Sequence, residues 1–150
     1  DKRKTFGLAG EDKVYEAGQK TKIVTLKGWK IQLQICYDLR FPEISRNRVI
    51  GDSNFSYDLL VYVANWPEKR IEHWKTLLKA RAIENQACVI GVNRIGLDAN
   101  NLTYSGESMY IDQLGESQIF NTDIECVKFF TCSSKELMET RKNLPFLKDL

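Results

Sequence analysis

Cys36 lies within the stretch ICYDLRFPE, where an apolar segment gives way to charged residues. A cysteine thiol becomes a nucleophile when a base takes its proton or when an electropositive setting lowers its pKa. Pro42 and Glu43 fit the first turn of a helix, because proline needs no N–H acceptor there and a carboxylate suits the positive end of the helix dipole. Cys36 is therefore a candidate nucleophile at a strand-to-helix elbow, and the alternative is a buried structural cysteine.

A histidine or a carboxylate could serve as the base that activates this thiol. His73 is the single histidine of the chain, and a lone histidine beside Trp74 on an amphipathic helix is more often a packing or surface residue than a catalytic base. The scarcity of histidine favours a carboxylate base acting with a lysine, which can also stabilise an oxyanion. With one histidine and four scattered cysteines, we expect neither a zinc site nor a disulfide framework.

The elements that must position Cys36 alternate along the chain. Trp29, Ile31, Leu33 and Ile35 alternate with polar residues, which predicts a strand with the apolar side buried. We expect strands over residues 21–26, 29–36, 57–65, 87–93 and 109–116, with turns at Gly28 and Gly115. The strand over 57–65 is predicted to be buried on both faces. We expect helices over residues 42–49 and 69–85 and from Ser133 or Ser134 onward, with a polar loop over 95–108. This order favours an α/β layered sheet in one domain.

Composition limits the function classes. The 150 residues are 43% hydrophobic and 28% charged, as in a soluble globular domain. The 22 basic and 20 acidic residues are dispersed, so neither nucleic acid nor a membrane is an expected partner. Because no apolar run approaches the roughly 20 residues needed to span a bilayer and no signal-peptide pattern opens the chain, we expect a cytoplasmic protein. The chain opens with DKRKTF and reaches its first strand near Thr21, which we interpret as the interior of something longer.

Several separated motifs together closely resemble carbon–nitrogen hydrolases of the nitrilase superfamily. They are DKRKTF with AGEDKVYEAG, ICYDLRFPE, YDLLVYVANWP and HWKTLLKARAIENQACVIGVNRIG. They occur in the family's order and spacing over nearly the whole chain. The resemblance is greatest to the omega-amidase branch, whose members act on monoamides of dicarboxylic acids such as 2-oxoglutaramate.

The resemblance implies an α-β-β-α sandwich of the nitrilase type and a Glu–Lys–Cys catalytic set without cofactor or metal. Cys36 matches the nucleophile, Lys2 the catalytic lysine and Glu11 a supporting acidic residue. The general-base glutamate belongs to the family's N-terminal portion and has no counterpart here. Residues 1–150 therefore resemble the C-terminal portion of a single hydrolase domain that requires its own N-terminal segment. A homodimer or higher homo-oligomer is also implied.

In the enzymes that this chain resembles, the thiolate attacks the amide carbon, ammonia leaves, and water releases the acid from a thioester. The resemblance places Lys2 and the backbone N–H of Tyr37 where the carbonyl oxygen becomes negative.

For the residues that could line a substrate pocket, the sequence leaves two alternative roles each for Trp66 and Arg40. Trp66 either lies at the pocket mouth or belongs to the core. Arg40 either binds a substrate carboxylate or, as we favour, forms a structural ion pair with a buried acid. Arg81 and Glu84 are spaced as a surface or interface pair, and Tyr104 could help to close the pocket.

Three functions are compatible with these motifs. The leading hypothesis is an amidase for a small carboxylated amide. The second is a non-catalytic fragment whose role is assembly. The third is a hydrolase whose substrate is instead a nitrile, a carbamoyl amine or a larger amide.

Overall fold

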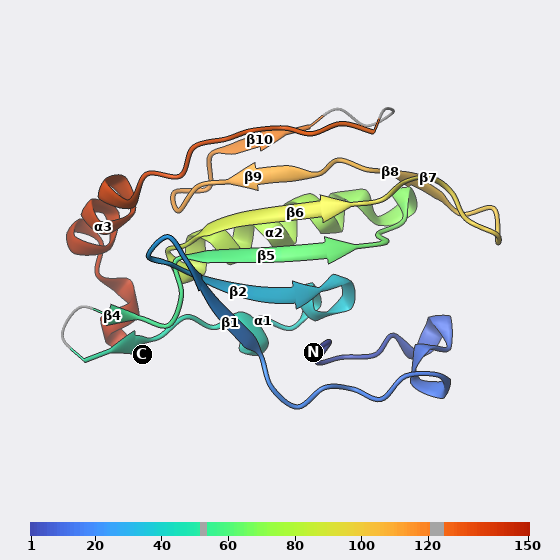
Figure 1. Ribbon diagram of the computed structural model, residues 1–150, viewed down its shortest axis with the longest axis horizontal. Helices are drawn as coiled ribbons and strands as arrows, with labels where there is room; N and C mark the ends of the chain where they lie inside the picture. Colours follow the sequence, from blue (N-terminus) through green and yellow to red (C-terminus); the bar gives the residue numbers. More distant parts are fainter. Residues whose placement is uncertain (52–53, 121–124) are drawn as a thin grey trace.

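The computed structural model describes residues 1–51, 54–120 and 125–150. Within these ranges a six-stranded sheet runs in the order β1-β2-β5-β6-β9-β10 (Figure 1). Its strands are β1 (Lys22–Leu26), β2 (Trp29–Ile35), β5 (Leu59–Ala64), β6 (Cys88–Asn93), β9 (Met109–Ile111) and β10 (Ser117–Ile119). Two small hairpins accompany it, formed by β3 (Val49–Ile50) with β4 (Asn54–Phe55) and by β7 (Ile95–Leu97) with β8 (Thr103–Ser105).

The helices are few and mostly short. The α-helices are α1 (Pro42–Ser45), α2 (Ile71–Asn85) and α3 (Ser134–Asn143). The 3₁₀ helices are η1 (Gly7–Ala9), η2 (Glu11–Lys13), η3 (Cys36–Arg40), η4 (Glu68–Arg70) and η5 (Phe146–Asp149). The predicted cap of the terminal helix is confirmed, since the Ser133 hydroxyl accepts a hydrogen bond from the Glu136 N–H at 3.2 Å.

The strand directions bring distant residues to one edge of the sheet. β2, β5 and β6 are parallel, whereas β1 pairs antiparallel with β2 as the predicted hairpin. Ile35 at the end of β2 pairs with Val63 near the end of β5. Residues that follow these two strands therefore meet at the edge where Figure 1 also places the β7–β8 hairpin and the N-terminal helical turns.

One face of the sheet packs against α2 and forms the main core. Trp74, Leu78 and Ala82 of α2 are fully buried against Leu60 and Val89 of the sheet. The approach is close enough that a Cβ at Gly91 would lie 2.4 Å from Leu78 Cδ1. This β6 position therefore requires glycine.

The predicted orientation of the strand over 29–36 is wrong. Gln32 and Gln34 are 4% and 3% exposed and face the helical layer, where the Gln32 amide donates to the Ile44 carbonyl at 3.1 Å. The apolar Leu33 and Ile35 lie on the opposite face and are about 40% exposed. The period-2 pattern gave the strand, but period alone does not say which face is covered by the rest of the chain.

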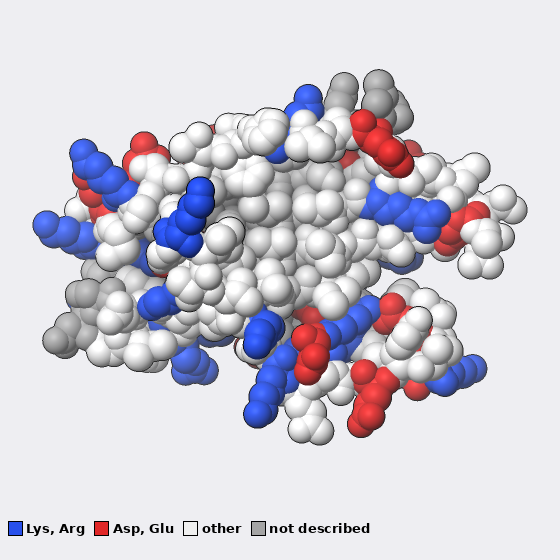
Figure 2. Space-filling view, in the orientation of Figure 1, with Lys and Arg blue, Asp and Glu red and all other residues white. Residues whose placement is uncertain are grey.

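The face opposite α2 is only partly covered. Val63 and Val92 on it are each 48% exposed, so the prediction of burial on both faces for the strand over 57–65 is also wrong. Figure 2 shows this side as a broad uncharged area flanked by charged residues. Phe130 and Cys132 cover part of it near Tyr110, whereas Leu33, Ile35, Val63 and Val92 remain between 38% and 48% exposed.

The predicted helix over 42–49 stops at Ser45. Arg46 leaves the helical conformation with ψ of 114°, because the next residue is held by tertiary contacts. The Asn47 side chain donates to the carbonyls of Tyr57 and Asn85, both at 3.0 Å. These long-range bonds outweigh the local preference for helix.

Two segments near the sheet edge also differ from their predictions. The predicted loop over 95–108 contains the β7–β8 hairpin, whose turn is closed by Asp98 accepting from the N–H groups of Asn100 and Leu102. The predicted strand over 109–116 ends at Ile111, where Asp112 caps a turn in the same way and the chain returns as β10. Both aspartates provide local acceptors that favour a turn.

Arg81 and Glu84 pair across one helical turn at 2.9 Å, but Arg81 is buried and not on the surface. Its guanidinium also donates to the Leu39 carbonyl at 2.7 Å, which fixes η3 against α2.

The α/β fold class is confirmed. Among the described residues, no helix combines the length and apolar character that a bilayer crossing requires.

The contact between β6 and α2 gives a stability prediction. Gly91→Ala should lower the free energy of unfolding of the protein by about 1–3 kcal/mol, because the added methyl group overlaps Leu78 and Trp74. Gly7→Ala is the matched control, since its Cβ would meet Asp12 only at ordinary contact distances, and it should change stability by no more than about 0.5 kcal/mol. Denaturant unfolding measures both, and equal stability of the two variants would contradict the packing argument.

Candidate active site

Cys36 occupies the predicted elbow. β2 ends at Ile35 and η3 begins at Cys36 itself, which adopts a left-handed conformation with φ of +46°. A non-glycine residue in this region costs on the order of 1–3 kcal/mol, so its surroundings must hold it there. The thiol lies at a cavity of about 500 Å³ and donates to the Asn65 carbonyl at 3.9 Å.

The elbow is held by Asp38, whose importance the sequence did not reveal. Its fully buried carboxylate accepts from the N–H of Ile35 at 3.2 Å, from that of Arg3 at 3.0 Å and from that of Lys4 at 2.8 Å. One side chain thus joins the elbow to the N-terminal segment. An acidic residue three positions beyond the strand end is a helix N-terminal signal that could have indicated this role.

Lys2 and Glu11 form an ion pair at the wall of the same cavity. Glu11 also accepts from the Phe6 N–H at 2.8 Å. Burial raises the pKa of Glu11, but the hydrogen bonds from Lys2 and Phe6 and the charge of Lys2 together outweigh it and lower the pKa below 4.5. Glu11 is therefore a carboxylate at neutral pH and fixes the lysine ammonium.

Of the two routes to an activated thiol, an electropositive setting that lowers the pKa is not the one seen at Cys36. Burial is the largest influence and raises the pKa of Cys36 above 9.0, while Lys2 and the Asn65 carbonyl oppose it and Glu11 and Asp38 add to it. Cys36 is consequently a neutral thiol at physiological pH. A base must remove its proton before it can act as a nucleophile.

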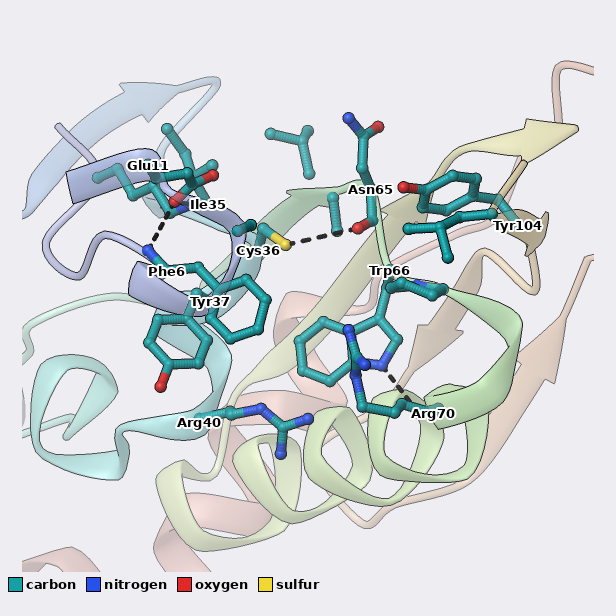
Figure 3. Close-up of a pocket in the computed structure, with 16 residues that line it drawn as sticks. Phe6, Glu11, Ile35, Cys36, Tyr37, Arg40, Asn65, Trp66, Arg70 and Tyr104 are labelled. Atoms are coloured by element: carbon teal, nitrogen blue, oxygen red, sulfur yellow. Dashed lines mark hydrogen bonds and ion pairs between the residues drawn. The ribbon is translucent and has the colours of Figure 1, made fainter. Parts of the chain in front are cut away.

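All six residues predicted for the site line this one cavity, as Figure 3 shows for most of them. They are Lys2, Glu11, Cys36, Tyr37, Arg40 and Trp66. Tyr37 is the second residue of η3, and the N–H groups of a first helical turn have no acceptor within the helix. The cavity also includes residues that were not predicted, among them Phe6, Ile35, Val63, Asn65, Arg70 and Leu102.

Within residues 1–51, 54–120 and 125–150, Arg40 has no ion pair with a buried acid of the kind that we favoured. Its Nη2 lies 3.2 Å from His73 Nδ1, and its guanidinium carbon lies 4.8 Å from the centre of the Trp66 ring. His73 is exposed on α2 and is not among the residues that line the cavity. The contact with His73 therefore keeps the Arg40 guanidinium over the Trp66 ring.

Trp66 combines its two predicted alternatives. It is 3% exposed and packs against Trp74 with ring centres 5.6 Å apart, so it belongs to the core, and it also lines the cavity. Its indole N–H donates to the Arg70 carbonyl at 2.8 Å, and its backbone N–H donates to Asn93 Oδ1 at 2.7 Å. Trp66 thus links the end of β5 to η4.

Asn93 and Asp98 fix the far wall of the cavity, and the sequence did not single out either. The Asn93 amide donates to the carbonyls of Trp66 and Gly106, at 3.0 and 2.8 Å, which ties the β5 end to the base of the β7–β8 hairpin. The Tyr104 hydroxyl lines the cavity from this hairpin and donates to Asp98 at 2.9 Å. In the described part of the chain, no three His, Cys, Asp or Glu side chains are grouped as metal ligands would be.

Comparisons with known proteins agree with this geometry. Residues 2–125 match the family model described as carbon-nitrogen hydrolase. The chain is 54% identical to the omega-amidase YafV of Yersinia enterocolitica over 118 residues, 79% of this chain and 44% of the relative. It is 34% identical to the 2-oxoglutaramate amidase of Bacillus subtilis (strain 168) over 145 residues, 97% of this chain and 54% of the relative.

A solved structure extends the agreement to the backbone. A CN-hydrolase superfamily protein from Xanthomonas campestris, with an arsenic adduct in its active site, superimposes with a TM-score of 0.95 at 45% identity. The match covers 100% of this chain and 57% of that one, and the chain spans about half the length of the curated relatives it matches. Family model, relatives and fold thus agree with the motifs around Cys36, and the chain belongs to the carbon-nitrogen hydrolase family.

Proposed function

We propose that the protein is an amidase that cleaves the carbon–nitrogen bond of a small omega-amide of a dicarboxylic acid, such as 2-oxoglutaramate. The observation that carries this proposal is the convergence of the Cys36 thiol and the Lys2–Glu11 pair on one cavity from segments 34 residues apart. The omega-amidase and 2-oxoglutaramate amidase names of the relatives support the choice of substrate.

In this proposal Cys36 attacks the amide carbon and forms a thioester as ammonia leaves. The Lys2 ammonium and the Tyr37 N–H stabilise the negative charge that develops on the carbonyl oxygen. Glu11 is a positioning residue for Lys2. Water then hydrolyses the thioester and releases the acid, so no redox step or cofactor is needed.

The general base is the part of the catalytic set that we assign outside residues 1–150. Glu11 is a poor candidate because its pKa is lowered and its Oε2 atom already accepts from Lys2 and Phe6. Asp38 is a poor candidate because both of its oxygens accept backbone N–H groups. We propose that a glutamate of an N-terminal portion of the same domain removes the thiol proton.

The open sheet face supports this assignment. Ile35 and Val63 belong both to that partly exposed face and to the cavity lining, so a segment covering the face would also border the cavity. Residues 1–150 would then be the C-terminal portion of one sandwich domain. A cytoplasmic location and a homodimer or higher oligomer remain predictions.

Ammonia release from 2-oxoglutaramate by the full-length protein tests the proposed function. Cys36→Ala should abolish turnover, whereas His73→Ala should leave it largely unchanged because His73 lies outside the cavity. A loss in His73→Ala as large as in Cys36→Ala would favour a Cys–His mechanism. Turnover of nitriles or carbamoyl amines in place of omega-amides would favour another substrate, and absence of turnover would favour a role in assembly.

Removing the lysine should show its role in charge stabilisation. Lys2→Ala should lower kcat of the full-length enzyme by about 10²- to 10³-fold, the usual cost of one oxyanion donor. Lys4→Ala is the matched control, because its ammonium lies over the Phe41 ring at 5.2 Å and its side chain is not part of the cavity lining. Steady-state kinetics compares them, and similar losses in both variants would argue against a specific role for Lys2.

The Glu11 pKa predicts a pH-dependent contribution to stability. Because the pKa in the folded protein lies below the ordinary value of 4.5, the contribution is complete above pH 4.5 and is lost as pH falls through the folded-state pKa. The difference in unfolding free energy between the wild type and Glu11→Gln should therefore be constant from pH 7 to about 5 and shrink below it.

Denaturant unfolding at a series of pH values measures this difference. Glu16→Gln removes an exposed carboxyl and controls for the change in net charge. A wild-type advantage over Glu11→Gln that increases on acidification would contradict the assigned direction of the shift.

A further inference from the structure

Two cysteines outside the cavity lie together on the sheet face opposite α2. Cys88 is the first residue of β6 and is 1% exposed, and Cys132 is half-buried and packs against the cluster that contains Cys88 and Tyr110. The two side chains hydrogen-bond to each other, and both thiols are free. They are 44 positions apart in the chain, so only the fold brings them together.

An aromatic stack holds the segment that carries Cys132 on the sheet. Residues 125–133 run from the β10 edge of the sheet to α3 (Figure 1). The Phe130 ring stacks on Tyr110 of β9 with ring centres 4.7 Å apart and an interplanar angle of 13°. In an extended segment, residues two apart point to the same side, so Cys132 faces the sheet as Phe130 does.

The helix that follows Cys132 is anchored beside Cys88. Arg141 of α3 donates to Asp58, the residue before β5, at 2.7 Å. The Gln113 amide donates to the Thr140 hydroxyl of α3 at 3.2 Å, and its Oε1 atom accepts from the Cys88 thiol at 3.7 Å. Both sides of Cys132 are therefore fixed close to the start of β6.

The two thiols differ in acidity. The hydrogen bond from Cys88 lowers the pKa of Cys132 below 9.0, with a further contribution from Tyr110, although burial opposes both. The same hydrogen bond and burial raise the pKa of Cys88. Cys132 therefore ionises more readily than Cys88 and is the better nucleophile of the pair.

We propose that Cys88 and Cys132 form a redox-sensitive pair that closes a disulfide on reaction with hydrogen peroxide. The Cys132 thiolate attacks one peroxide oxygen and becomes a sulfenic acid, and the hydroxide that leaves takes up the proton that Cys132 has lost. The Cys88 sulfur then attacks the Cys132 sulfur, the S–O bond breaks, and the oxygen leaves as water with the Cys88 proton. Two thiols are oxidised by two electrons, and one peroxide is reduced to two waters.

The disulfide would act on stability and not on the chemistry at Cys36. Cys88 opens β6, whereas Asn93 at the other end of this strand contacts the wall of the Cys36 cavity. A bond from Cys88 to Cys132 would tie residues 125–132 and α3 covalently to the sheet. Closing so long a loop restricts the unfolded chain, so the oxidised protein should unfold at a higher temperature. This inference does not depend on the proposed amidase activity.

The test treats the reduced full-length protein with a few equivalents of hydrogen peroxide and maps its peptides without reduction. We expect a linked peptide that joins Cys88 to Cys132 as the main product. Tm should rise by about 5 °C or more, and dithiothreitol should reverse both changes. Cys132→Ser should abolish the linked peptide and the rise in Tm.

Cys126→Ser is the matched control, because Cys126 is the exposed cysteine of the same segment. It should form the Cys88–Cys132 disulfide as the wild type does. In denaturant the preferred partner of Cys132 should instead be Cys126, since only five residues separate them and a short loop closes more easily. This contrast shows whether the fold selects the pair.

Three results would overturn the inference. The first is a Cys126–Cys132 disulfide as the main product in the folded protein. The second is peroxide treatment that leaves Cys88 and Cys132 unlinked, whether unmodified or oxidised separately. The third is a rise in Tm that persists in Cys132→Ser.

Discussion

The buried carboxylate of Asp38 is the interaction on which the site depends. It accepts N–H groups from Arg3 and Lys4 on one side and from Ile35 on the other, and a buried carboxylate that loses such partners is costly. The same bonds hold Cys36 in its left-handed conformation and place Lys2 beside it. The geometry of nucleophile and lysine therefore follows from one buried side chain.

The three parallel strands β2, β5 and β6 supply the rest of the cavity. β2 and β5 end side by side, so the carbonyl of Asn65 meets the thiol and Trp66 forms the next part of the wall. Asn93, at the end of β6, ties this wall to the β7–β8 hairpin. Each strand end thus contributes one polar group or ring to a common edge, as expected of open parallel sheets.

The charged groups of the cavity set the position of Lys2 and influence the pKa of Cys36. Glu11 holds the Lys2 ammonium at the cavity, but burial outweighs the charge of Lys2 and raises the pKa of Cys36. Because its pKa is raised, the Cys36 thiol is protonated near neutral pH and needs a base before it can react.

The sequence by itself determined the family, the α/β class, five of the six strands of the main sheet, the elbow at Cys36 and the cap at Ser133, because these depend on local periodicity and short motifs. Only the tertiary structure decided which face of β2 is buried, that Arg40 contacts His73, that Asp38 joins segments 35 residues apart and that the Cys36 pKa is raised. These properties arise from groups distant in the chain, whose proximity and desolvation exist only once the sheet has brought them together.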